Sequence, residues 1–172
     1  MTTVVEHGFD VSGATTVKPS APNAGAQFLD ETTGQVEHYD ESRTQWNRSV
    51  GCAVATYDFA SDGGAISAIS LDVIIPNNAV IWDGYIDVVT TCTSGTDAAT
   101  IAIHAQTAND LVSAVAISAA TDWDAGLRAT IPVGTVASGI KLTADRTITA
   151  TIAVEAVTAG KFHVVLFYIT TD

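Results

Sequence analysis

The sequence predicts an all-β protein: a jelly-roll-like antiparallel β-sandwich preceded by an extended arm and a β-hairpin. Apolar residues alternate with small or polar residues along several segments of the second half, which is the period-two pattern of half-buried strands. Short groups of Gly, Asn, Asp and Ser separate these segments, as turns do in sandwiches. Charged residues make up only 15% of the 172 residues, and Thr, Ser, Ala and Gly replace them, a composition that suits tightly packed sheets.

Residues 1–24 are expected to form an extended N-terminal arm. Gly8, Gly13, Pro19 and Pro22 interrupt a stretch rich in Thr, Ser and Ala. Such a segment buries too little apolar surface to offset the entropy lost on ordering. We therefore expect the arm to order against a partner.

Residues 25–47 are predicted to form a β-hairpin that serves as an attachment segment. Two short strand-like runs, 27–30 and 35–39, flank a turn in which Gly34 supplies the positive φ that a tight turn needs. Trp46 follows after a polar loop. A lone hairpin is marginally stable in water, so this one must dock on the main domain or on another chain.

Residues 48–172 are predicted to form the sandwich, and an eight-stranded jelly roll fits the number of strand-like segments best. The expected strands span residues 50–56, 66–75, 80–92, 99–104, 148–155 and 162–169, and the expected turns span 62–64, 76–78, 93–97 and 158–161. Residues 109–120 also fit a helix capped by Asn109 or Asp110, but their Val and Ile content favours a strand.

Two strands carry patterns that bear on function. In 80–92, the side chains of Val80, Trp82, Ile86 and Val88 are expected on one face and those of Asp83, Tyr85 and Asp87 on the other. The last strand is apolar on both faces, so a loop or a neighbouring subunit must cover the face that the core does not. We therefore predict a subunit interface at Phe162, Val164, Val165, Phe167 and Ile169.

The charge balance excludes two classes of partner. Seven Lys and Arg face 19 Asp and Glu, a formal net charge of −12, and the sequence contains no basic cluster to hold phosphates. The same charge argues against binding to anionic membranes. The first residues lack the pattern of a signal peptide, and no apolar run reaches the length of a membrane span, so we expect synthesis and use in a cytosolic setting, or release by lysis.

No residue pattern indicates catalysis, a metal or a cofactor. The Gly-x-Ser-x-Gly, dinucleotide-binding and P-loop motifs do not occur. The four histidines are scattered, and the aspartates at 83, 87, 97, 122 and 124 lack the spacing of a calcium loop, which favours turn residues over ligands. Cys52 and Cys92 are interpreted as reduced, buried small residues rather than as a disulfide.

The large aromatic residues allow two interpretations. In the simpler interpretation, Trp82 is a core residue and Trp46 anchors the hairpin. An exposed aromatic face that stacks on sugar rings is the alternative, and it would use Tyr85 with Asp83 and Asp87.

Two stretches resemble known proteins. Residues 24–40, followed by Trp46, resemble hairpins that recur in fibre and head-associated proteins of tailed phages. Landmarks in the second half resemble phage virion proteins of the capsid-decoration (cement) or head-fibre kind, and they lie at residues 76–81, 87–94, 97–102, 123–126 and 154–161. The resemblance lies in the general residue pattern and in turn motifs, and it includes no catalytic residues.

The resemblance implies a homotrimeric β-sandwich on the exterior of a virion that is assembled in the host cytoplasm. Its expected partner is the major capsid protein, held by the arm and the hairpin. The apolar side chains of these segments are then the expected capsid contacts: Phe9, Val11, Val17, Phe28 and Trp46. A receptor- or glycan-binding module of a tail fibre or spike is the alternative function.

Overall fold

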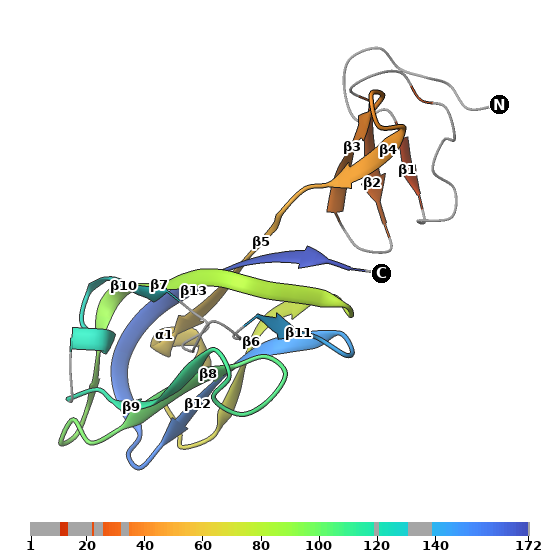
Figure 1. The fold of residues 1–172 in the computed structure, drawn as a ribbon. Coiled ribbons are helices and arrows are strands. Elements are labelled where there is room, and N and C mark those ends of the chain that lie inside the picture. The colour runs from red at the N-terminus through yellow and green to blue at the C-terminus, as the bar shows by residue number, and fades with distance from the viewer. Residues whose placement is uncertain are drawn as a thin grey trace. The chain divides into compact units, whose positions relative to one another are not determined.

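The computed structural model describes residues 11–13, 22, 26–31, 35–118, 121–130 and 139–171. The chain divides into two compact units, Met1–Gly51 and Cys52–Asp172 (Figure 1). The expected division into arm, hairpin and sandwich stays a prediction.

The N-terminal unit contains a four-stranded sheet among its described residues. Its strands, in their order across the sheet, are β1 (Val11–Gly13), β2 (Gln27–Asp30), β3 (Gln35–Asp40) and β4 (Gln45–Arg48). β2, β3 and β4 pair antiparallel, whereas β1 pairs with β2 in parallel. The hairpin read from the sequence corresponds to β2 and β3. The sequence did not reveal β1 and β4, because three or four residues are too short to show a period and are held only by their neighbours.

An aromatic cluster packs this small sheet. Phe28 is fully buried, and its ring centroid lies 5.8 Å from that of Trp46, which in turn lies 5.4 Å from that of Tyr39. The side chain of Glu37 is also buried, and Arg48 Nε donates a hydrogen bond to its Oε1 at 3.0 Å across the β3–β4 pair. Because a buried charge is costly without a partner, this ion pair permits Glu37 to lie inside the unit.

The C-terminal unit is a β-sandwich. One sheet has the order β10-β7-β13-β5 with β11 beside β7, and the other has the order β6-β12-β8-β9. The strands are β5 (Gly51–Asp58), β6 (Ala68–Ile75), β7 (Ala79–Ser94), β8 (Thr100–His104), β9 (Val112–Ala116), β10 (Gly126–Thr130), β11 (Ile140–Lys141), β12 (Arg146–Ala153) and β13 (Val157–Thr170). Two short helices, α1 (Phe59–Asp62) and η2 (Thr121–Trp123), connect strands.

The two sheets face one another across a continuous apolar core (Figure 1). Tyr57 stacks on Phe162 with ring centroids 4.9 Å apart, and the ring of Trp123 lies 5.1 Å from Phe162 on another side. The predicted all-β antiparallel sandwich is confirmed. Consecutive strands from β5 to β8 alternate between the sheets, and jelly-roll connectivity stays our interpretation of this order.

Residues 109–120 contain the strand β9, as their composition favoured. Two other local predictions were wrong. The turn expected at residues 158–161 lies earlier, at Val154 and Glu155, and β13 already begins at Val157. The sequence misled here because Gly160 is typical of a turn, whereas in the structure it allows close contact with β7. Cys52 is exposed on β5, whereas Cys92 is buried as expected.

Candidate functional site

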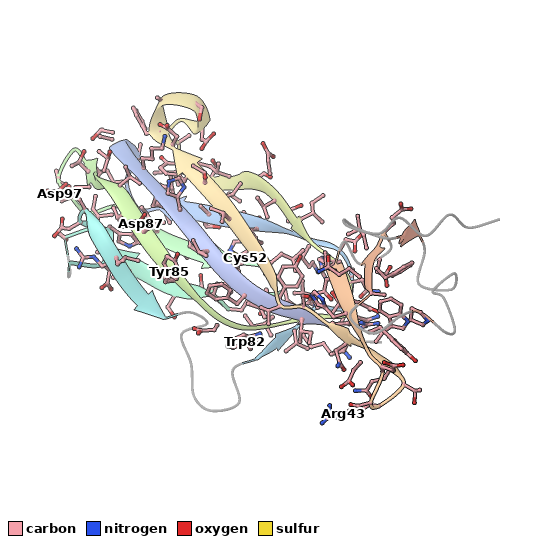
Figure 2. All side chains as sticks on the ribbon, turned by 90° about the horizontal axis from the view of Figure 1, so that it is seen from above. Arg43, Cys52, Trp82, Tyr85, Asp87 and Asp97 are labelled. Atoms are coloured by element: carbon pink, nitrogen blue, oxygen red, sulfur yellow. The ribbon has the colours of Figure 1, made fainter. Side chains whose placement is uncertain are left out.

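The candidate site is the face of the five-stranded sheet that points away from the core, here called the outer face. Figure 2 looks onto it, with Trp82, Tyr85 and Asp87 along β7 and Cys52 on β5. The pairing of β7 with β13 and the alternation of buried residues identify its side chains. They include Cys52, Val54, Thr56, Asp58, Val80, Trp82, Asp83, Tyr85, Asp87, Val89, Leu127, Lys141, Lys161, His163, Val165, Phe167 and Ile169.

A β-bulge places Trp82 on this face. Phe167 pairs with Asp83 and the next residue, Tyr168, pairs with Ile81, so Trp82 is an extra residue on β7. The bulge turns Ile81 into the core, where it is fully buried, and leaves Trp82 51% exposed. The prediction that Trp82 is a core residue was therefore wrong, because strict alternation fails at a bulge that only the pairing with β13 reveals.

Three aromatic rings lie in a row across β7 and β13. The ring of Phe167 lies 6.3 Å from that of Trp82 and 6.4 Å from that of Tyr85, measured between centroids. Val165 lies directly opposite Tyr85 and is 7% exposed. Val165 is therefore largely covered, whereas Trp82, at 51% exposure, supplies exposed apolar surface and the tyrosine hydroxyl adds a hydrogen-bonding group.

Polar groups border the aromatic strip. His163 Nδ1 and Thr56 Oγ1 are hydrogen-bonded at 2.9 Å, which joins β13 to β5, and His163 lies opposite Asp87 in the β7–β13 pair. Asp83 accepts a hydrogen bond from the backbone N–H of Gly84 at 2.8 Å. The Thr56–His163 hydrogen bond is thus an inter-strand contact, whereas Asp83 accepts its hydrogen bond within β7.

An ion pair marks one end of the outer face. Lys161 Nζ lies 2.9 Å from Asp58 Oδ2, and the same carboxylate group caps α1 by accepting from the backbone N–H of Ala60. Lys161, through its hydrogen bond, and the Ala60 N–H lower the pKa of Asp58.

The predicted interface residues on β13 divide between the two faces of the sheet. Phe162 and Val164 are fully buried and point into the core of their own domain. Val165, Phe167 and Ile169 lie on the outer face. The strand β13 is therefore apolar on both faces because one set of its side chains lies in the core and the other set lies on the outer face.

The predicted capsid-binding residues belong to the N-terminal unit. Phe9 and Val17 lie outside the described residues, and Val11 lies in β1. Phe28 and Trp46 contact one another within the small sheet. Since Phe28 is fully buried, it supports the shape of this unit from inside.

Sequence reasoning missed Val54, Val89 and Leu127 as members of the site. Each is a large apolar side chain at least 50% exposed on the outer face. Leu127 pairs with Asp87, which places both on the same side of the sheet. Alternation along β7 and β10 was the available signal, but the sequence does not say which strands are neighbours.

A metal-binding cluster and a membrane-spanning helix were both sought in the part of the chain that the structure describes. Its His, Cys, Asp and Glu side chains form no group of three or more that could hold a metal ion. Among the same residues, no helix has the length and apolar character needed to cross a membrane. Asp97 instead accepts from the backbone N–H of Ser94 within a turn, as expected for a turn residue.

No protein-family model matches the sequence, and no curated protein matches it at a significant level. Two solved structures share its fold. A chain in the capsid of Ralstonia phage GP4 is 18% identical, with 72% of this chain and 86% of that chain covered at a TM-score of 0.52. A chain in the capsid asymmetric unit of cyanophage Pam1 is 15% identical, with 92% and 97% covered at a TM-score of 0.55. The chain thus has the fold of proteins found in two phage capsids.

Proposed function

We propose that this chain is a non-enzymatic structural protein of a tailed-phage virion. The observation that carries the proposal is the likeness to chains of two phage capsids, one of which spans 92% of this chain and 97% of its own length. The sequence resemblance to virion proteins points the same way, and the outer face offers apolar contact surface without a catalytic constellation.

Within that class, we assign the chain to the capsid exterior, as a decoration protein or a head-fibre subunit. The acidic charge of −12 suits a surface that has no nucleic acid to hold. The N-terminal unit attaches to the major capsid protein, and the sandwich forms a homotrimer through Val165, Phe167 and Ile169. Binding that bridges neighbouring capsomers stabilises the shell, because rupture must then break these contacts as well.

Co-sedimentation tests this assignment. Purified protein is mixed with emptied capsids of the phage that encodes it and, separately, with host cells. We expect it to pellet with capsids and to raise the temperature at which they rupture. Pelleting with host cells and not with capsids would reject the decoration role.

A receptor- or glycan-binding module is the second candidate. The exposure of Trp82 near Tyr85, Asp83 and Asp87 favours this function. Sugar rings stack on exposed aromatic rings, and carboxylates accept hydrogen bonds from sugar hydroxyls. In the same co-sedimentation experiment, pelleting of the protein with host cells would support this function.

A further inference from the structure

Exposed apolar side chains gather on the outer face of the five-stranded sheet. Val54, Trp82, Val89 and Leu127 are 50%, 51%, 50% and 69% exposed, and they come from β5, β7 and β10. The strand β12, in the opposite sheet, instead presents Thr147, Thr149 and Thr151 on the side away from the core. Contiguous exposed apolar surface of this kind marks an interaction site.

Trp82 is the most prominent residue of this surface. The bulge that carries it interrupts the β7–β13 ladder, and half of a large side chain remains in water. The ring of Phe167, 6.3 Å away, is its aromatic neighbour within the domain. Tryptophan is among the residue types that most often dominate the binding energy at protein interfaces.

The charges on this face indicate the partner. The chain carries 19 acidic and seven basic side chains, so two copies repel one another over most of their surfaces. On the outer face the carboxylates are Asp58, Asp83 and Asp87, and Lys141 and Lys161 nearly balance them. A basic partner would be attracted to the acidic surfaces outside the outer face. A second copy, which is equally acidic, meets the least repulsion when it approaches the outer face.

We infer that a second copy of this chain docks on the outer face and that Trp82 is the anchor of the contact. The interface extends from Trp82 across Phe167 and Tyr85 and continues to Val89 and Leu127 toward the other end of β7. The inference rests on the proposed function, since a decoration or fibre subunit acts as a multimer. It adds the residues on β7 and β10 that the apolar pattern of β13 did not include.

Sedimentation velocity of the full chain over a range of concentrations tests the inference. Trp82→Ser and Leu127→Ser should each weaken self-association by about tenfold or more, because each removes a large apolar contact. The matched control is Ile74→Ser, which alters an equally exposed residue (65%) on β6 of the other sheet. It should associate like the wild type. Leu127 lies on an exposed strand at 69% exposure, so its substitution leaves the core intact and serves as the second variant if Trp82→Ser does not fold.

Three results would overturn the inference. The wild type could remain a monomer at all concentrations, or Ile74→Ser could dissociate as readily as Trp82→Ser. The third result is a monomeric wild type whose tryptophan fluorescence shifts when host polysaccharide is added, together with no such shift in Trp82→Phe. That result would identify the outer face as a sugar-binding surface. Capsid co-sedimentation on the same samples separates the two proposals. A multimer that does not bind capsids rejects the virion role alone. A monomer that binds capsids rejects this interface and the homotrimer, and leaves the virion role standing.

Discussion

At the scale of single residues, Gly160 shows how closely β7 and β13 approach. Its φ is +148°, and a Cβ atom placed on it would lie 2.6 Å from Cys92 Sγ, well inside van der Waals contact. Cys92 is 3% exposed, so it has little room to move. A glycine is therefore required here both by the backbone angle and by the neighbouring side chain.

Gly160→Ala should destabilise the sandwich by about 2–3 kcal/mol, because it adds a steric clash to backbone strain. Gly63→Ala is the matched control: its φ is +71°, but a Cβ there meets nothing within 4 Å. We expect a smaller loss for this variant, because backbone strain is then the sole cost. Urea unfolding gives both values, and equal losses would mean that the Cys92 contact relaxes freely.

Val154 should be replaceable with a gain in stability. It is the central residue of a tight turn closed by the Glu155 N–H and the Ala153 carbonyl at 2.8 Å, and its φ is +70°. β-branched residues are strained at positive φ, and this one is 69% exposed, so it contributes little packing. Val154→Gly should raise the melting temperature by about 2–4 °C. A fall in melting temperature would show that the valine makes a stabilising contact.

The two thiols should differ sharply in reactivity. Burial raises the pKa of the Cys92 thiol to about 12, and Cys52 is exposed on β5. Under native conditions a maleimide should label one thiol per chain, and Cys52→Ser should abolish that labelling. In denaturant both thiols should react. Native labelling of Cys52→Ser would mean that the sandwich opens around Cys92.

At the scale of elements, one carboxylate ties the β12–β13 turn to the loop after β7. Glu155 accepts hydrogen bonds from Ser94 Oγ, from the backbone N–H of Thr96 at 3.0 and 3.1 Å, and from that of Ala98 at 3.2 Å. The hydrogen bond from Ser94, followed by the one from the Thr96 N–H, holds the pKa of Glu155 below its usual value. A single side chain thus connects two loops whose residues Ser94 and Glu155 are 61 positions apart.

This link predicts a specific pH dependence. Because the pKa is lower in the folded state, the stabilisation is fully present above about pH 4.5 and is lost as the pH falls through the lowered value. Glu155→Gln should therefore lower the melting temperature at pH 7, and its difference from the wild type should shrink below pH 4.5. Glu41→Gln, at an exposed turn of the other unit, is the control and should show little difference at either pH. A constant difference for Glu155→Gln would contradict the assignment.

At the scale of the whole molecule, the two units differ in what holds them together. The core cluster of the sandwich draws its buried side chains from Cys52–Asp172, so this unit contains its own core. In the N-terminal unit the described interior rests on a few residues, among them Phe28, Trp46 and the Glu37–Arg48 pair. Such a small interior is consistent with the proposed role of this unit as an attachment segment.

Deletion of residues 1–24 should leave the melting temperature of the sandwich within about 2 °C of the wild type, since the core cluster found among the described residues lies within Cys52–Asp172. The same truncation should abolish or greatly weaken binding to capsids, because it removes the proposed attachment segment. Differential scanning calorimetry and capsid co-sedimentation measure the two effects. Wild-type occupancy of capsids by the truncated chain would place the attachment surface on the sandwich.

The sequence alone determined the all-β class, the antiparallel sandwich and the strand character of residues 112–116, because these follow from side-chain alternation and turn residues that are local in the chain. The interface that it predicts at Val165, Phe167 and Ile169 stays a prediction. Only the tertiary structure decided where alternation breaks. The bulge that exposes Trp82, the close contact that explains Gly160, and the outward position of Cys52 all depend on which strands are neighbours and in what register. Register shifts arise from pairing between segments distant in sequence, and a one-residue shift moves a side chain from the core to the surface.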